Sequence, residues 1–298
     1  GTCAALEAYR AGADVLVIER ASGGGGASAL SSGIFYLGGG TPVQKALGYD
    51  DDADNMAAFL MASCDPLDPV AVRSFCDDSA AHFDWLEAQG VPFERTGFKG
   101  KAVYLNTPEC LLTTGNEKAW PYCEIARPVA RGHKVAGTGE NAGAVGMAAL
   151  LQRCVDEGVP AIYDSNVTAL VRNDAGAIVG VRVKQPGNVS LHVEARRGVI
   201  IAAGSNNLNY EMIRENIPLM SDTAEPLGTP ANDGAGILLG MSVGAATVAM
   251  DGLIPTASIY PPAQLIKGII VNKLGRRFVA EDAYHGRTGA FVMEQPDQ

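Results

Sequence analysis

The sequence contains little charge and no long apolar run, and both absences limit the kind of protein it encodes. Of its 298 residues, 19% are charged and 47% are hydrophobic, a balance that excludes a disordered chain. No apolar run reaches the ~20 residues that a membrane-spanning helix requires, and no basic-then-apolar leader begins the chain. We therefore expect a globular, cytoplasmic protein without a membrane span, large enough for one large domain or two ordinary ones.

Basic clusters and paired cysteines are also scarce. The formal net charge is −10, and the only dense basic cluster is Arg276-Arg277, so nucleic acid and anionic membranes are excluded as main partners. The six cysteines form no C-x-x-C pair and lack the spacing of a structural zinc site, which favours free thiols. The acidic run 50–55 is interpreted as a solvated turn, because nothing fixes its carboxylates around a metal. No metal site is predicted.

The first residues predict a helix followed by a strand. Good helix formers run from Thr2 to Ala11, Gly12 is placed to end the helix, and residues 15–19 (VLVIE) are an apolar run of strand length. In a dinucleotide-binding unit such a pair follows a G-x-G-x-x-G turn and ends in an acid that binds the ribose. Gly1 matches the last glycine of that turn and Glu19 matches the acid. We therefore expect the first strand and the first two glycines of the turn to precede Gly1.

Four consecutive glycines, residues 23–26, come soon after this acid. Glycine lets the backbone approach a ligand closely, and a run of free N–H groups ahead of a helix makes an anion site. A flexible linker is the alternative. The position directly after a strand and before the apolar segment 33–40 (GIFYLGGG) favours a loop that closes over a ligand.

Two further helices are predicted in the middle of the chain. The segment 68–90 begins with an Asp-Pro pair suited to a helix start and ends at a glycine. A second helix is predicted from about Ala144 to Glu157, again followed by a glycine. The block from Val91 to Gly139 between them predicts only short strands and loops.

The second half of the chain predicts a small antiparallel sheet and then a buried strand. Turn residues at 174–176 and 186–188 separate three strand-like runs, a pattern typical of a three-stranded meander. The segment 198–205 (GVIIAAGS) is predicted to be a buried strand whose small final residues let a cofactor pass. A glycine-rich turn with Asp233 at its start then enters a helix.

The order of these pieces resembles the flavoprotein-subunit family of fumarate reductases, succinate dehydrogenases and 3-ketosteroid dehydrogenases. The stretches that carry the resemblance are Gly1 with Glu19, GGGGAS, VTALVRND, VIIAAGS, NDGAGILLGMSVGA and VNKLGRRFVAED. The resemblance implies an α/β fold with a Rossmann-like FAD-binding domain over 1–254, including the antiparallel meander. It also implies that the start of an inserted α+β cap domain, which binds substrate, occupies 255–298.

The resemblance further implies which residues contact FAD. Gly1 would face the pyrophosphate, Glu19 the adenosine ribose, and the backbone of Val167 the adenine edge. The other implied cofactor-binding residues are Arg20, Ser22, Gly25, Gly26, Ala27, Ser28, Ser32, Gly33, Ala203, Gly204 and Asp233. For Asp233, a helix N-cap is the alternative role. Members with covalent flavin carry a histidine in the loop after the second strand, and ASALSSG has none, so non-covalent FAD is expected.

The stretch 275–287 (GRRFVAEDAYHGR) distinguishes branches of the family. Fumarate-reducing members place an arginine three residues after the glutamate, whereas here Tyr284 follows Glu281 at that spacing. A guanidinium binds a carboxylate bidentately and a phenol cannot, so the tyrosine favours the ketosteroid branch. Tyr284 is the predicted catalytic or substrate-orienting phenol. Arg277 and Glu281, four residues apart, remain open between a structural pair and a role in the chemistry.

The sequence thus predicts an FAD-dependent oxidoreductase acting on a carbon–carbon bond next to a carbonyl, in a 3-ketosteroid-like substrate. The carbon next to a ketone is acidic and can lose a proton to a phenolate or a hydrogen-bonded phenol. The adjacent β-carbon transfers a hydride to flavin N5. An unidentified electron acceptor would reoxidise the flavin. The alternatives are a reductase of an unsaturated carboxylate such as fumarate or urocanate, and a non-catalytic flavoprotein fragment.

Overall fold

The chain forms two compact units. The structure is a computed structural model that describes residues 1–64, 68–99, 108–113, 116–137, 142–220, 225–256, 267–281 and 283–296. Unit 1 comprises Gly1–Leu30 and Met147–Gly252, and unit 2 comprises Ser31–Gly146 and Leu253–Gln298. None of the helices in the described ranges has the length and apolar character of a transmembrane segment. The division into an FAD-binding domain and a cap domain at residue 255 stays a prediction.

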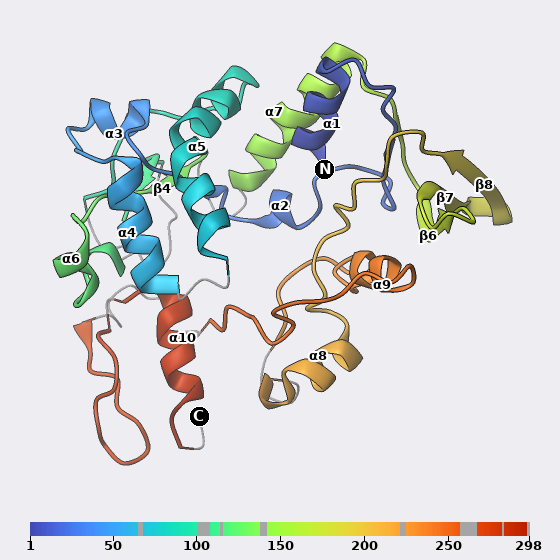
Figure 1. The fold of residues 1–298 in the computed structure, drawn as a ribbon. Helices are drawn as coiled ribbons and strands as arrows, with labels where there is room; N and C mark the ends of the chain where they lie inside the picture. The colour runs from blue at the N-terminus through green and yellow to red at the C-terminus, as the bar shows by residue number, and fades with distance from the viewer. Residues whose placement is uncertain are drawn as a thin grey trace. The chain divides into compact units, whose positions relative to one another are not determined.

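Unit 1 contains a parallel strand pair, a separate three-stranded sheet and several helices (Figure 1). Its helical segments are α1 (Thr2–Arg10), α2 (Gly26–Leu30), most of α7 (Ala142–Glu157), η2 (Pro186–Asn188), α8 (Tyr210–Asn216), η3 (Pro218–Met220) and α9 (Ala235–Met241). Its strands are β1 (Val17–Ile18), β5 (Ala161–Ile162), β6 (Asn166–Arg172), β7 (Ile178–Gln185) and β8 (Val189–Glu194).

The predicted helix and strand at the start of the chain are confirmed as α1 and β1. Gly12 adopts a φ of +78° just after α1, the left-handed conformation that ends helices and favours glycine. Strand β1 pairs in parallel with β5, with Val17 opposite Ala161. The apolar run after the first helix therefore does enter a parallel ladder.

The predicted three-stranded meander is also confirmed. Its strands lie in the order β6-β7-β8 and both pairs are antiparallel. Val181 and Val183 on the central strand β7 are buried, so one face of the sheet supplies part of the core of unit 1. The predicted turn at 186–188 is the segment η2, where Gly187 has a φ of +72°.

The prediction of a buried strand at 198–205 is wrong. The segment belongs to no ladder of the described chain, and Ile200 and Ile201 are 69% and 44% exposed. A strand forms only where a neighbouring strand takes its hydrogen bonds, and the described partner of β1 is β5. The segment instead packs beside helix starts: a methyl group on Gly1 would lie 3.6 Å from Cβ of Ala202.

Unit 2 is mainly helical, and α4 and α5 lie side by side in it (Figure 1). Its helical segments are α3 (Pro42–Ala46), α4 (Ala53–Cys64), α5 (Pro69–Ala88), η1 (Asn116–Lys118), α6 (Tyr122–Ile125) and α10 (His285–Met293), and α7 begins in it. An antiparallel sheet of order β2-β4-β3 completes it, with β2 (Ile34–Tyr36), β3 (Leu111–Leu112) and β4 (Gly132–Lys134).

The predicted helices at 68–90 and 144–157 are confirmed as α5 and α7. The backbone N–H of Ala71 donates to the Asp68 carboxylate at 3.0 Å, which satisfies one of the free donors at the start of α5. Phe83 and Leu86 are at most 1% exposed and supply the buried face of this helix. The apolar spacing and the cap together explain why the sequence predicted it.

An ion pair lies at the centre of unit 2. The Arg131 guanidinium binds both oxygens of the Asp51 carboxylate, with Nε–Oδ2 at 3.0 Å and Nη2–Oδ1 at 2.7 Å, and both side chains are fully buried. Asp51 also accepts hydrogen bonds from Gln44 at 3.0 Å and Asn55 at 2.8 Å. Burial disfavours its charge, but the bonds from Arg131 and Asn55 prevail and hold the pKa of Asp51 below its usual range.

The interpretation of residues 50–55 as a solvated turn is therefore wrong: Asp51 is buried, residues 53–55 begin α4, and Asn55 is buried as well. The partner of Asp51 lies 80 residues away in the sequence, so the acidic run itself gave no sign of it. No cluster of three or more metal-ligand side chains occurs among the described residues, and the prediction of no metal site stays a prediction.

His133 is a second buried titratable group beside this pair. Its Nδ1 lies 3.0 Å from the carbonyl oxygen of Arg131, which can only accept, so Nδ1 carries the proton. The neutral ring then accepts at Nε2 from the Thr41 hydroxyl, 2.8 Å away. Burial lowers the pKa of His133 to about 4, so the ring is neutral at pH 7.

We expect His133 to make the protein less stable as the pH falls from 6.5 to 4. An unfolded histidine binds a proton below pH 6.5 whereas the folded ring stays neutral down to about pH 4, so protons in this window favour the unfolded chain. The contribution is complete above pH 6.5 and is lost as the pH falls, in total about 3 kcal/mol. Denaturant unfolding at a series of pH values measures it.

The variant His133→Gln removes the titrating group and should flatten the pH dependence in this window. His82→Gln, at an exposed position of α5, is the matched control and should keep the wild-type slope. The same slope in His133→Gln as in the wild type would contradict the assignment.

Candidate functional site

The glycine loop between β1 and α2 presents a row of backbone donors. Within the described chain, the N–H groups of residues 23–26 donate to no acceptor. Gly25 and Gly26 have φ values of +122° and +50°, conformations that favour glycine. A methyl group on Gly24 would lie 2.8 Å from Cδ2 of Leu151, so the loop also packs closely against α7. These donors suit an anion such as a phosphate.

Glu19 is fixed at the carboxyl end of the parallel strand pair. Its backbone N–H donates to Ile162 at 2.9 Å, and its backbone carbonyl accepts from Ser165 at 2.9 Å. One carboxylate oxygen, Oε1, accepts from the N–H of Ala21 at 2.8 Å, and the other accepts nothing from the described residues. A held carboxylate with one unused oxygen has the chemistry needed to bind a ribose hydroxyl.

An ion pair joins two of the predicted cofactor-binding residues. Arg20 Nη1 donates to Asp233 Oδ2 at 2.7 Å, and the other Asp233 oxygen accepts from the N–H of Ala235 at 3.1 Å. Burial opposes the charge on Asp233, but the bond from Arg20 prevails and lowers its pKa. Asp233 therefore bonds the N–H of the first residue of α9 and ties α9 to the segment after β1, but the N-cap of this helix is Gly234, so the alternative role of Asp233 as the N-cap is wrong.

Val167 lies next to a β-bulge at the edge of a groove. The ladder between β6 and β7 shifts register between Val167 and Ala169, and a bulge leaves a residue without a ladder partner. The groove has a volume of about 310 Å³, which is large enough for a planar ring system. It is lined by Val167, Thr168, Ala169, Ala235, Leu238, Leu239 and Ser242.

Two further predicted residues of unit 1, Gly1 and Ala203, lie near the starts of α1 and α9. A methyl group on Gly236 in α9 would lie 3.1 Å from Cβ of Ala203, and Gly1 packs on the neighbouring Ala202. Gly204 has a φ of +85°, which favours glycine. Of the predicted residues on the loop and on α2, Ser22, Gly26, Ala27 and Ser28 are exposed and Gly25 is half-buried. The structure thus places the segment 201–204 between the starts of α1 and α9.

Ser32 and Gly33 belong to unit 2. The backbone conformation and the close packing of Gly33 are sufficient to explain why this residue is a glycine. Gly33 has a φ of +68°, and a methyl group there would lie 2.7 Å from the backbone nitrogen of Gly143. Ser32 beside it is half-buried. A role for either residue in cofactor binding stays a prediction.

Tyr284 immediately precedes α10 and is half-buried. Its ring centroid lies 4.2 Å from that of His285, and burial raises the pKa of its phenol. The phenol is therefore neutral at pH 7 and can donate a hydrogen bond. Its catalytic role stays a prediction.

Arg277 and Glu281 form a structural pair, one of the two alternatives that the sequence left open. Arg277 Nε donates to Glu281 Oε1 at 3.0 Å, and the N–H of Ile270 donates to the same oxygen at 2.9 Å. The bonds from Arg277 lower the pKa of Glu281 to about 2, and Glu281 is only 5% exposed. The carboxylate is therefore charged at pH 7 and joins both sides of the turn between residues 270 and 281.

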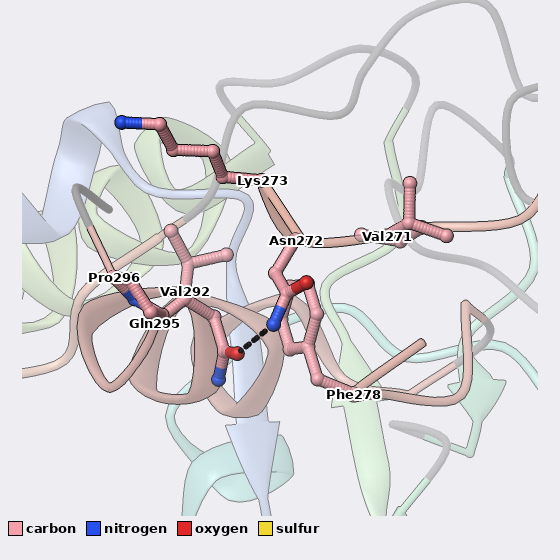
Figure 2. A pocket seen from close by; sticks show the side chains of 8 residues that line it. Val271, Asn272, Lys273, Phe278, Val292, Gln295 and Pro296 are labelled. Atoms are coloured by element: carbon pink, nitrogen blue, oxygen red, sulfur yellow. Dashed lines mark hydrogen bonds between the residues drawn. The ribbon is translucent and has the colours of Figure 1, made fainter. Parts of the chain in front are cut away.

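The turn that leads to Tyr284 is built on Asn272. Asn272 Oδ1 accepts from the N–H groups of Leu274 and Arg276, both at 3.0 Å, and Nδ2 donates to Gln295 at 3.1 Å. Figure 2 shows this last bond beside a cavity of about 270 Å³ between the turn and α10. The cavity is lined by Ile270, Val271, Asn272, Lys273, Phe278, Val292, Gln295 and Pro296.

The buried polar network of unit 2 was missed by the sequence analysis. Besides Arg131 and Asp51, it includes the Tyr36 hydroxyl, which lies 3.2 Å from Oε1 of the buried Glu117. The available signal was the run 129–135 (VARGHKV), where cationic residues stand between apolar ones. That pattern indicates a buried charged strand but does not identify the acids that pair with it.

The sequence matches one protein family from end to end, the FAD binding domain, over residues 1–298. It is 30% identical to 3-oxo-5-alpha-steroid 4-dehydrogenase of Comamonas testosteroni over 344 residues, covering 99% of this chain and 63% of that protein. The structure resembles 3-ketosteroid-delta4-(5alpha)-dehydrogenase from Rhodococcus jostii RHA1, solved with 4-androstene-3,17-dione, with a TM-score of 0.94 and 39% identity. That match covers 100% of this chain and 62% of the solved one.

A third similarity is to the open conformation of a flavocytochrome c3 fumarate reductase. The TM-score is 0.73 at 25% identity, over 99% of this chain and 49% of that one. The chain thus spans less than two thirds of the length of each of these relatives. The predicted fold and the predicted cofactor, FAD, are confirmed by these similarities. The chain belongs to the FAD binding domain family.

Proposed function

We propose that this chain is the FAD-binding part of an oxidoreductase that removes two hydrogens from the C4–C5 bond of a 3-ketosteroid. The observation that carries the proposal is Tyr284, a neutral half-buried phenol at the place where fumarate-reducing relatives are expected to have arginine. Two nearby arginines are engaged elsewhere: Arg277 binds Glu281, and Arg287 stacks on the rings of Tyr122 and Phe291 at 5.0 and 4.9 Å. The two ketosteroid dehydrogenase relatives support this choice.

The residues of unit 1 fit non-covalent FAD. The N–H groups of the glycine loop would bind the pyrophosphate, and Glu19 the ribose. Val167 would border the adenine, with Arg20 and Asp233 holding α9 in place. When bound, FAD supplies the hydride acceptor. The same proposal assigns cofactor contacts to Gly1, Ser22, Gly25, Gly26, Ala27, Ser28, Ser32, Gly33, Ala203 and Gly204.

Tyr284 would handle the proton of the reaction. Dehydrogenation removes one hydride and one proton from the substrate, and the proton must pass to a base near the ketone. Because burial raises the pKa of Tyr284, the phenol holds its proton at pH 7 and only a small fraction is phenolate. In the dehydrogenating direction the phenolate is the base, so the rate should rise with pH.

A reductase of an unsaturated carboxylate is the second candidate, favoured by the similarity to flavocytochrome c3 fumarate reductase. Such an enzyme needs a guanidinium free to bind the substrate carboxylate. We further propose a cytoplasmic location and an unidentified electron acceptor that reoxidises the flavin. A non-catalytic flavoprotein is the remaining alternative.

We expect the purified protein to be yellow, with a flavin absorbance near 450 nm, an approximate value set by the cofactor itself. Anaerobic addition of a 3-ketosteroid should bleach this absorbance, whereas succinate should leave it unchanged. Bleaching by succinate alone would favour the second candidate. A bound flavin that neither compound bleaches would favour the non-catalytic alternative, and absence of bound flavin after reconstitution with FAD would contradict the proposal.

Tyr284→Phe should lower kcat by about 10²-fold or more while FAD remains bound, because only the phenolic oxygen is lost. In the wild type, kcat should rise with pH towards the raised pKa of Tyr284, since the phenolate fraction increases. The variant should lose this rise. Steady-state kinetics from pH 6 to 10 measure both effects, and an unchanged kcat in the variant would remove Tyr284 from the mechanism.

Asp233→Asn should weaken FAD binding about two- to fivefold, because it breaks a partly exposed ion pair that positions α9. The variant pair Arg20→Asp with Asp233→Arg should recover part of the loss. Quenching of flavin fluorescence on binding measures the Kd. Glu157→Gln is the matched control: it breaks the similarly exposed pair with Arg10 in the same unit, where no cofactor contact is proposed. Equal losses in both variants would count against a role for Asp233.

A further inference from the structure

Gly286 occupies a position where glycine is normally a disadvantage. It is the second residue of α10 and is buried. In a helix, glycine is less favourable than alanine by about 1 kcal/mol, because it loses more backbone entropy on folding. Its φ is not among the positive values found in the chain, so its backbone would accept any residue. Local structure gives no reason for a glycine here, and the reason must lie in the space around it.

That space is filled by the ring of Tyr284. A methyl group on Gly286 would lie 2.9 Å from Cε1 and 3.4 Å from Cδ1 of this ring. The first distance is shorter than carbon atoms can approach without a shift. The aromatic ring therefore lies directly on the Cα of Gly286.

The ring can move away from an added methyl only by turning about its own side-chain bonds. Its own backbone is held because the carbonyl of Tyr284 accepts from the N–H of the fully buried Thr288 at 3.0 Å. The ring of His285 lies 4.2 Å from it between centroids. A side chain at position 286 would therefore turn the phenol out of its observed orientation.

A second contact at Gly286 can be separated from the first. The same methyl would lie 2.8 Å from Cγ2 of Ile254. Ile254 is 73% exposed, so it can rotate into solvent at little cost. The phenol is the neighbour whose position depends on the absence of a side chain at 286.

We infer that Gly286 is a positioning residue for the phenol of Tyr284, and that its lack of a side chain sets the orientation in which this phenol meets the substrate. The inference rests on the proposed catalytic role of Tyr284. Proton transfer and hydrogen bonding to a ketone require an accurate placement of the phenolic oxygen, and misplacement by about 1 Å can cost 10²-fold in rate. Gly286 touches neither substrate nor cofactor in this proposal and acts only through Tyr284.

The test compares Gly286→Ala with variants that separate its two contacts. In flavin-loaded protein with a 3-ketosteroid substrate, Gly286→Ala should lower kcat about tenfold or more, with the flavin content unchanged. The double variant Ile254→Ala with Gly286→Ala should show the same loss, and Ile254→Ala alone should not. Gly240→Ala is the matched control, because a methyl at this helical glycine of α9 would meet only Cβ of Ala245 at an ordinary 3.5 Å.

Two readouts distinguish positioning from a general loss of structure. In a Tyr284→Phe background, Gly286→Ala should cause no further loss of kcat. Independently of activity, a titration followed by the ultraviolet absorbance of phenolate, with Tyr284→Phe as the reference, should show the Tyr284 pKa moving in Gly286→Ala towards the ordinary value for tyrosine.

Full kcat in Gly286→Ala, while Tyr284→Phe is impaired, would overturn the inference and leave the proposed function intact. An equal further loss in the Tyr284→Phe background would also overturn it, because Gly286 would then act without the phenol. If instead Tyr284→Phe keeps full activity, the proposed catalytic role of Tyr284 fails. In that case the phenolate titration still decides whether Gly286 sets the position of the ring.

Discussion

Two fully buried side chains, Arg131 and Asp51, hold together the polar centre of unit 2. Asp51 also binds Gln44 of α3 and Asn55 of α4, and Arg131 leads directly into β4. A buried ion pair adds little net stability, because both charges lose their hydration on folding. Removal of one partner is nevertheless destabilising by about 3–5 kcal/mol, because the other charge is left buried and unpaired. The pair therefore acts mainly by allowing only one arrangement of these elements.

Charged residues near the predicted site also form ion pairs within the protein. Arg20 binds Asp233, and Arg277 binds Glu281, so two arginines that might have been assigned to a ligand have protein partners. Among the predicted site residues, the groups left for ligands are the N–H groups of the glycine loop, one carboxylate oxygen of Glu19 and the phenol of Tyr284. N–H donors suit phosphates and a neutral phenol suits a ketone, which is the physical basis of the proposed substrate preference.

The residues proposed to function stand at the ends of secondary-structure elements. Glu19 follows β1, Asp233 precedes α9, and Tyr284 precedes α10. At the end of a helix or strand the chain is held rigidly on one side, while some backbone N–H and C=O groups and nearby side chains have no partner within the element. Glycine appears beside these positions for two different reasons: Gly25 needs a left-handed backbone, whereas Gly286 needs room for a neighbouring ring.

Several elements could be predicted because their sequence signals are local. The cap at Asp68, the stop at Gly12 and the turns of the meander each depend on residues within one or two turns of chain, so α1, α5 and β6 to β8 could be predicted. The glycine loop and Glu19 could also be located, because their spacing to β1 is short. The tertiary structure alone decided that Asp51 is buried against Arg131 and that the apolar segment 198–205 forms no strand. These outcomes depend on partners distant in sequence, and neither burial nor a ladder hydrogen bond exists until the fold brings the partners together.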